Sequence, residues 1–231
     1  MEGDAQHTAE AVARRSYGKL VAFLAARTRD VAAAEDALSE AFASALSEWP
    51  RTGAPDNPEA WLMTVARRKL IDASRRRKTG AGAEPQLQLI AEELGASETM
   101  DIPDQRLALM FACAHPAIEE SVRAPLILQV VLGLNAETIA SSFLTSPAAM
   151  SKRLVRAKEK IRQAGIPFEV PGREDLPTRL SAVLDAIYAA FTEGWTDPAG
   201  TDAARRDLTG EVLFLAHLAT ELMPDEPEAL R

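Results

Sequence analysis

Six of the thirteen residues from Met150 to Arg162 are lysine or arginine, although the chain has a formal net charge of -8. In a helix, four of these cations share one side: Lys152, Arg153, Arg156 and Lys160. Guanidinium and ammonium groups bind phosphates, and arginine also reads base edges in the major groove. Solvated helices usually mix charge signs to form i, i+4 pairs, but only Glu159 interrupts this run. The stretch predicts DNA binding, with a solvated helix face as the alternative.

A second basic cluster precedes residue 79. Residues 61–80 carry seven lysines and arginines against one acid. The cations are Arg67, Arg68, Lys69, Arg75, Arg76, Arg77 and Lys78. Because they surround the end of a predicted helix, we expect contact with phosphates without one defined reading face. Positive charge near a helix C-terminus also complements the helix dipole, and this alternative stays open.

Three carboxylates, Glu35, Asp36 and Glu40, lie beside the apolar residues Leu38 and Phe42. Carboxylates perform acid–base catalysis where a pocket or a partner residue accompanies them, and the sequence indicates neither. An acidic docking face for another protein, or a solvated surface, fits better. The sequence also has no Walker-type loop, Rossmann glycine pattern, GxSxG or HExxH motif. We therefore expect no catalytic residue, no enzymatic activity and no cofactor.

The cysteine and histidine content argues against a metal site. One cysteine, Cys113, excludes an intramolecular disulfide, and three scattered histidines do not complete a zinc motif. No apolar run approaches the roughly 18 residues of a membrane helix, and no signal segment is recognisable. We expect a cytoplasmic protein with no metal and no membrane partner.

The elements that must position these residues are all predicted to be helices. Aromatic residues make up only 5% of the sequence, and Ala, Leu, Glu and Arg dominate it. One apolar stripe of helical period comprises Leu38, Phe42, Ala45, Leu46 and Trp49. After the breaker segment "WPRTGAPDNP", Pro58 suits the first turn of the next helix.

The C-terminal basic stretch belongs to a predicted pair of helices. Asn135 and Ser146 fit the N-caps of the two helices, and Pro147 fits the start of the second. The apolar side of the second helix consists of Met150, Leu154, Ala157 and Ile161. A further stripe follows, made of Leu180, Val183, Leu184, Ile187, Tyr188 and Phe191. The pattern predicts a helix-turn-helix followed by another helical segment.

Breaker residues and charge divide the chain into four segments. Residues 1–78 form a first helical domain, 79–103 a linker, and 104–166 a second helical domain. Residues 167–231 form an acidic helical extension, with nine acids against three arginines from 193 onward. The predicted fold class is therefore all-α, with two small domains, a linker and a C-terminal helical segment.

The order of these segments resembles bacterial sigma factors of the extracytoplasmic-function (ECF) group. The resemblance rests on "AEDALSEAFASAL", "WLMTVARRKLIDASRRR" and "LNAETIASSFLTSPAAMSKRLVRAKEKI", and covers roughly residues 10–165. "IPDQRLALMFACAHPAI" and "RLSAVLDAIYAAFTEGW" look like an ECF subfamily whose C-terminal extension has TPR-like repeats. The final "ELMPDEPEALR" is similar to the entry into such a repeat, so we expect an extension that is either truncated or naturally short.

The resemblance implies a role in transcription initiation. Residues 1–78 would be sigma domain 2 and residues 104–166 sigma domain 4, and the partners would be core RNA polymerase and promoter DNA. Contacts with the polymerase β′ clamp helices would come from Asp36, Leu38, Glu40 and Phe42. The minus-10 element would be contacted by Arg67, Arg68, Lys69, Arg75, Arg76 and Arg77. The minus-35 element would be contacted by Ser151, Lys152, Arg153, Arg156 and Lys160. The polymerase β subunit is a further expected partner, and regulation would come from an anti-sigma factor or the C-terminal extension.

Two other functions stay open on the sequence. A helix-turn-helix regulator would bind operators as a dimer through residues 121–163, with half-sites one helical turn or a multiple apart. A helical adaptor would bind protein partners through its C-terminal block, and its basic faces would be incidental. The basic helix at 61–78 favours the sigma factor, because a simple regulator does not need it.

Overall fold

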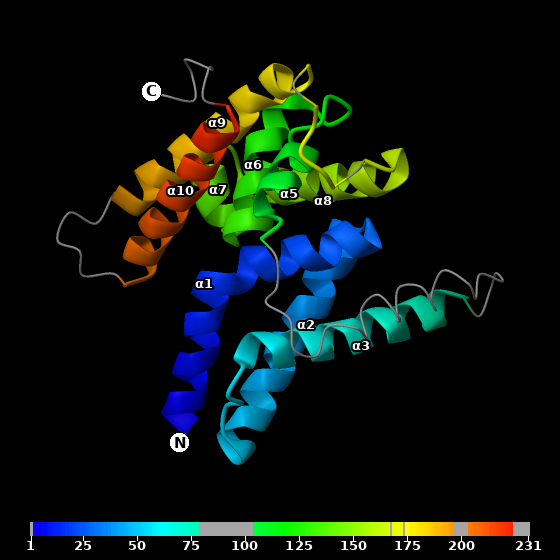
Figure 1. Cartoon of the computed structure of the whole chain (residues 1–231), viewed down its shortest axis with the longest axis vertical. Coiled ribbons are helices and arrows are strands. Elements are labelled where there is room, and N and C mark those ends of the chain that lie inside the picture. Colours follow the sequence, from blue (N-terminus) through cyan, green and yellow to red (C-terminus); the bar gives the residue numbers. More distant parts are fainter. Residues whose placement is uncertain (1, 79–103, 167, 173, 196–202, 224–231) are drawn as a thin grey trace.

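The computed structural model describes residues 2–78, 104–166, 168–172, 174–195 and 203–223 (Figure 1). Every regular element in these ranges is an α-helix, which confirms the predicted fold class. The predicted linker, residues 79–103, lies outside the described residues. The four-part domain division therefore stays a prediction.

The first group of helices consists of α1 (Glu2–Thr28), α2 (Val31–Thr52) and α3 (Pro58–Lys78). The side chain of Asp30 caps α2 by accepting a hydrogen bond from the Ala33 N–H at 3.0 Å. Helix α3 begins at Pro58, as predicted. Of the predicted stripe on α2, Leu38, Ala45 and Trp49 are buried and Phe42 is half-buried, whereas Leu46 is 50% exposed. The stripe thus marks the packing side of α2, except at Leu46.

The second group lies above the first in Figure 1 and starts with α5 (Arg106–Cys113) and α6 (Glu120–Leu132). It continues with α7 (Ala136–Ser142), α8 (Pro147–Ala164), α9 (Leu176–Trp195) and α10 (Ala203–Leu222). Helices α9 and α10 pack side by side, and α9 also lies on α6. In the stripe predicted for α9, Leu180 and Val183 are buried, whereas Tyr188 is 75% exposed.

A buried arginine attaches α10 to the rest of the second group. Arg106 hydrogen-bonds to Asp104, with 2.9 Å between its Nε and Oδ1 of Asp104, and forms an ion pair with Glu211 of α10. Its guanidinium also lies 5.0 Å from the ring of Phe214. Burial would raise the pKa of Asp104, but the hydrogen bonds and charge of Arg106 outweigh burial and hold that pKa below its ordinary value.

Helix α1 joins the two groups through one continuous hydrophobic core. It packs against α2 and α3 on one side and against α5 and α6 on the other. At the crossing with α6, Gly18 lies so close to Val131 that a Cβ atom would overlap the Val131 carbonyl oxygen. Glycine is therefore required at this position to let the two backbones approach.

Gly18→Ala is expected to lower the free energy of unfolding by about 1–3 kcal/mol, because the added methyl group forces α1 away from α6. Urea unfolding followed by circular dichroism measures this change. The matched control is Gly210→Ala in α10, where a Cβ would meet no atom within 4 Å. This control should gain about 0.5–1 kcal/mol, since alanine is the better helix former. Equal effects of the two substitutions would contradict the close approach.

Candidate nucleic-acid interface

Two capped helices, α7 and α8, are joined by a short turn. Asn135 accepts a hydrogen bond from the Thr138 N–H at 2.9 Å, and Ser146 accepts one from the Ala149 N–H at 3.3 Å. Pro147 is the first residue of α8. Both predicted N-caps are thus confirmed. Helix α8 ends at Ala164, and the capping residue Gly165 has a left-handed φ of 59°, which suits glycine.

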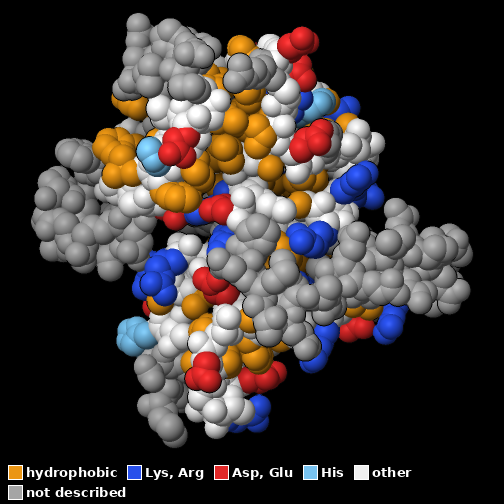
Figure 2. Space-filling model, viewed as in Figure 1, with side chains coloured by type: hydrophobic (Ala, Val, Ile, Leu, Met, Phe, Trp, Pro, Cys, Tyr) orange, Lys and Arg blue, Asp and Glu red, His pale blue; other side chains and the backbone are white. Residues whose placement is uncertain are grey.

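Helix α8 has one buried side and one cationic side. Met150, Leu154, Ala157 and Ile161 are buried, as predicted. Ser151, Lys152, Arg153, Arg156 and Lys160 are all exposed, and the apolar Val155 among them is 66% exposed. Figure 2 shows Lys and Arg side chains along the right-hand side of the molecule, in the region reached by α8 and α3. The exposed cations of α8 are therefore placed to meet a polyanion without unfolding.

A third side of α8 packs against α2 through an ion pair between the two groups of helices. The Lys158 ammonium lies 2.5 Å from Oε2 of Glu35, and the two side chains are 13% and 12% exposed. Burial has the largest effect on the pKa of Glu35 and holds it above its ordinary value, and the charge of Asp36 raises it too. Lys158 and a hydrogen bond with Tyr17 lower this pKa but do not outweigh burial. The sequence does not predict this pairing, because no local pattern relates residues so far apart along the chain.

The acidic residues of α2 fall into different environments. Asp36 and Glu40 are exposed, whereas Leu38 is 0% exposed and packs in the core. Nζ of Lys69 lies 3.1 Å from Oε2 of Glu40, which joins α3 to α2. Glu40, which is predicted to contact the polymerase, and Lys69, which is predicted to contact DNA, are thus paired with each other in the free protein.

A groove of about 440 Å³ lies between α2, α3 and α8. Its charged lining residues are Asp30, Asp36, Glu40, Lys69, Glu159 and Arg162. The last two come from α8, where Arg162 donates a hydrogen bond to Glu159 at 3.0 Å. The exposed carboxylates of α2 and the C-terminal part of α8 thus face the same space.

The basic residues of α3 are spread around that helix. Arg68 is exposed, Arg67 is half-buried, and Nη1 of Arg75 lies 4.0 Å from Oδ1 of Asp72. The side chains of Arg76 and Arg77 lie outside the described residues. At the other end of α3, the half-buried Trp61 packs edge to face on Trp49, with 5.4 Å between ring centroids. The basic cluster has no single reading face within the described side chains.

Metal ions and membranes are two other kinds of partner that a helical protein can have. In the part of the chain that the structure describes, no group of three or more His, Cys, Asp or Glu side chains could hold a metal ion. Across the same residues, none of the helices combines the length and the apolar character needed to cross a membrane.

Comparisons with known proteins place these features in context. Residues 12–79 match a family model described as Sigma-70 region 2, and residues 179–231 match a family of unknown function (DUF6596). No solved structure matches the chain. The first match covers α2 and α3 and most of α1, which carry the acidic and basic residues described above.

Two curated relatives are similar over much of the chain. An uncharacterized protein, R00370, of Rhizobium meliloti (strain 1021) is 39% identical over 208 residues, which is 87% of this chain and 49% of that protein. The probable RNA polymerase sigma factor RfaY of Xanthomonas campestris pv. campestris is 30% identical over 171 residues, which is 67% of this chain and 41% of that protein. The chain thus spans less than half the length of each relative.

Proposed function

We propose that this chain acts as a sigma factor of the ECF group, which binds core RNA polymerase and directs it to a subset of promoters. The observation that carries this proposal is the joint presence of a region 2 match at residues 12–79 and an exposed cationic helix, α8. A protein with two DNA-contacting modules gains affinity when the polymerase holds both on one promoter. The chain itself performs no bond-making chemistry in this proposal.

Helices α7 and α8 act as a helix-turn-helix that contacts the minus-35 element. The buried side of α8 packs on the core, so Lys152, Arg153 and Arg156, which are exposed on the solvent side of this helix, can enter the major groove. Ser151 and Lys160 flank them and are also exposed. Arginine recognises guanine and phosphate groups with two parallel hydrogen bonds, so it is the residue expected to read the sequence.

Helix α3 contacts the minus-10 element in the same proposal. The exposed Arg68 and Arg75 are available to phosphates without rearrangement. Lys69 reaches DNA only after leaving Glu40, from which it lies 3.1 Å away. Arg76 and Arg77 are proposed contacts that rest on the basic composition of "SRRRK" alone.

The exposed carboxylates of α2 bind the polymerase. Asp36 and Glu40 lie one helical turn apart and both line the groove beside α8. The half-buried Phe42 adds apolar surface next to them, whereas the buried Leu38 holds α2 on the core. A partner with basic side chains fits this surface, because opposite charges steer the encounter and fix its register.

Asp36→Ala is expected to weaken association with core RNA polymerase about tenfold, because it removes an exposed charge from the proposed contact. Fluorescence anisotropy of the labelled protein titrated with core polymerase measures the dissociation constant. The matched control is Asp56→Ala, which removes the same charge from an exposed position in the loop after α2, beyond the opposite end of that helix from Asp36. If both variants bind core polymerase as the unaltered protein does, Asp36 is not part of the contact.

A further inference from the structure

A cavity of about 300 Å³ lies where three parts of the chain meet. Its walls come from α1, from the end of α6 with the start of α7, and from α9 and α10. Small-molecule sites often lie at such junctions, and this volume is at the lower end of their range. A ligand in the cavity would therefore be small and would contact all three parts at once.

Charged side chains of opposite sign line the cavity from different helices. Arg14 belongs to α1, whereas Glu193 belongs to α9 and Glu211 to α10. Figure 2 shows a hollow on the left, between the two groups of helices, with acidic side chains at its upper edge and basic side chains at its lower edge. The cavity can therefore hold a ligand that carries both a negative and a positive group.

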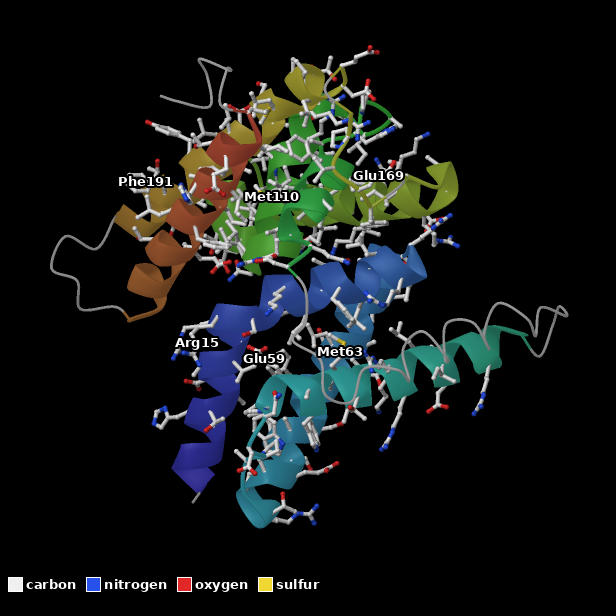
Figure 3. All side chains as sticks on the ribbon, viewed as in Figure 1. Arg15, Glu59, Met63, Met110, Glu169 and Phe191 are labelled. Atoms are coloured by element: carbon white, nitrogen blue, oxygen red, sulfur yellow. The ribbon has the colours of Figure 1, made fainter. Side chains whose placement is uncertain are left out.

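The charged residues also have contacts within the protein. Nη1 of Arg14 lies 3.9 Å from Oε2 of Glu10, and Glu211 forms an ion pair with the buried Arg106. The side chain of Arg14 is 35% exposed, so water screens its pairing with Glu10, which contributes little to stability. The neighbouring Arg15 points outward from α1 (Figure 3). A ligand carboxylate in the cavity is therefore assigned to Arg14.

The space between the charged walls is lined by aliphatic side chains. Leu132, Leu134 and Leu208 are half-buried and pack against the core. A short aliphatic group that fills the cavity would remove their remaining apolar surface from water. The hydroxyl of Thr138, in α7, adds one hydrogen-bond donor and acceptor to the lining.

The end of α6 adds negative potential on the side of the two carboxylates. Leu132 is the last residue of α6 and lines the cavity together with Gly133. The last carbonyl groups of a helix have no partner within it, and together they carry a partial negative charge. An ammonium group is therefore favoured in this part of the cavity.

We propose that this cavity binds a free α-amino acid with an aliphatic side chain. The guanidinium of Arg14 donates to the ligand carboxylate, and the carboxylates of Glu193 and Glu211 accept from its ammonium group. The three leucines enclose its side chain. This inference goes beyond the proposed function and does not rest on it, because no polymerase or DNA takes part in the binding.

L-leucine is the first probe, and isothermal titration calorimetry measures its dissociation constant. We expect saturable binding and a rise in melting temperature with leucine concentration, because the ligand binds only the folded protein. N-acetyl-leucine lacks the positive charge and leucinamide lacks the negative charge, so each should bind about tenfold more weakly. If L-leucine, isoleucine, valine and methionine all fail to bind, the inference is wrong.

Two variants test which side chains hold the two charged ends of the ligand. Glu193→Gln and Arg14→Gln should each weaken L-leucine binding about tenfold. The matched controls are Glu221→Gln and Arg51→Gln, which remove the same charges at exposed positions outside the cavity lining and should leave binding unchanged.

Comparison of the three probes within one variant separates ligand contact from a general loss of stability. In Glu193→Gln, the difference in affinity between L-leucine and N-acetyl-leucine should shrink, because the partner of the ammonium group is gone. In Arg14→Gln, the difference between L-leucine and leucinamide should shrink for the corresponding reason. If L-leucine binds all four variants as it binds the unaltered protein, it binds elsewhere, and the assignment of this cavity is overturned.

These measurements use the purified full chain alone, so they separate this inference from the sigma-factor proposal. A failure to bind core polymerase would leave the leucine titration unaffected. A failure to bind amino acids would leave the transcription experiment unaffected.

Discussion

Lys158→Met is expected to lower the free energy of unfolding by about 3–5 kcal/mol near neutral pH, because it leaves the buried carboxylate of Glu35 without its cation. Methionine keeps most of the apolar length of lysine, so the packing of α8 on α2 changes little. Urea unfolding monitored by circular dichroism measures the loss. The double variant Lys158→Met with Glu35→Gln removes both charges and should recover most of the stability.

The effect of Lys158→Met should depend on pH. Burial already raises the folded-state pKa of Glu35 above its ordinary value of 4.5, and loss of Lys158 raises it further. A carboxyl group with a raised pKa contributes its stability fully below the unfolded-state pKa and loses it as pH rises through the folded-state pKa. The penalty should therefore shrink as the pH is lowered toward 4.5.

The exposed pair of Lys69 and Glu40 is a matched control, because it also joins a lysine to a glutamate of α2. Lys69→Met should cost at most about 1 kcal/mol, since water solvates an exposed carboxylate that has lost its partner. Equal losses for Lys158→Met and Lys69→Met would contradict the burial of the Glu35 pair.

Arg153→Ala combined with Arg156→Ala is expected to cost about 1–3 kcal/mol of promoter binding for each arginine. Both side chains are exposed on the cationic side of α8, so their removal should leave the fold intact. The slope of log affinity against log salt concentration should also fall by about 0.9 for each phosphate that the variant no longer neutralises. Electrophoretic mobility shift of the polymerase–promoter complex at several salt concentrations measures both quantities.

A control for this variant must remove the same charge elsewhere. Arg15→Ala combined with Arg51→Ala does so at two exposed positions on α1 and α2. The control should change affinity little, because these positions lie outside the proposed DNA-contacting helices. If the two double variants lose equal affinity, α8 contributes only through net charge and does not contact the minus-35 element.

Features encoded by neighbouring residues were predictable from the sequence. The N-caps at Asn135 and Ser146 and the start of α3 at Pro58 depend on residue types within one helical turn. The buried and exposed sides of α8 follow from helical periodicity, because Met150 and Leu154 recur at helical spacing. Since the apolar side must face the core, the same periodicity places the cations of α8 on the outside.

Features that depend on distant residues were not predictable. Glu35 belongs to an acidic group by sequence, but it is buried against Lys158, and neither residue type signals this pairing. Arg67 belongs to a basic cluster by sequence, but it packs beside Arg27 over Phe23. The close approach of Gly18 to Val131 has no local signal either, since glycine also occurs at exposed positions such as Gly210.

Periodicity also overestimated burial at two positions. Leu46 and Tyr188 continue apolar stripes in α2 and α9, but they are 50% and 75% exposed. A stripe defines which side of a helix is apolar, whereas burial requires another element to cover each position along it. In the described part of the chain, no other element fully covers Leu46 or Tyr188.

Reconstituted run-off transcription tests the proposed function most directly. Purified core RNA polymerase is incubated with this protein and a genomic library of promoter fragments, and the transcripts are sequenced. We predict that specific transcripts start only when the protein is present and that it remains associated with core polymerase on gel filtration. An absence of both core association and initiation from every promoter fragment would contradict the sigma-factor role.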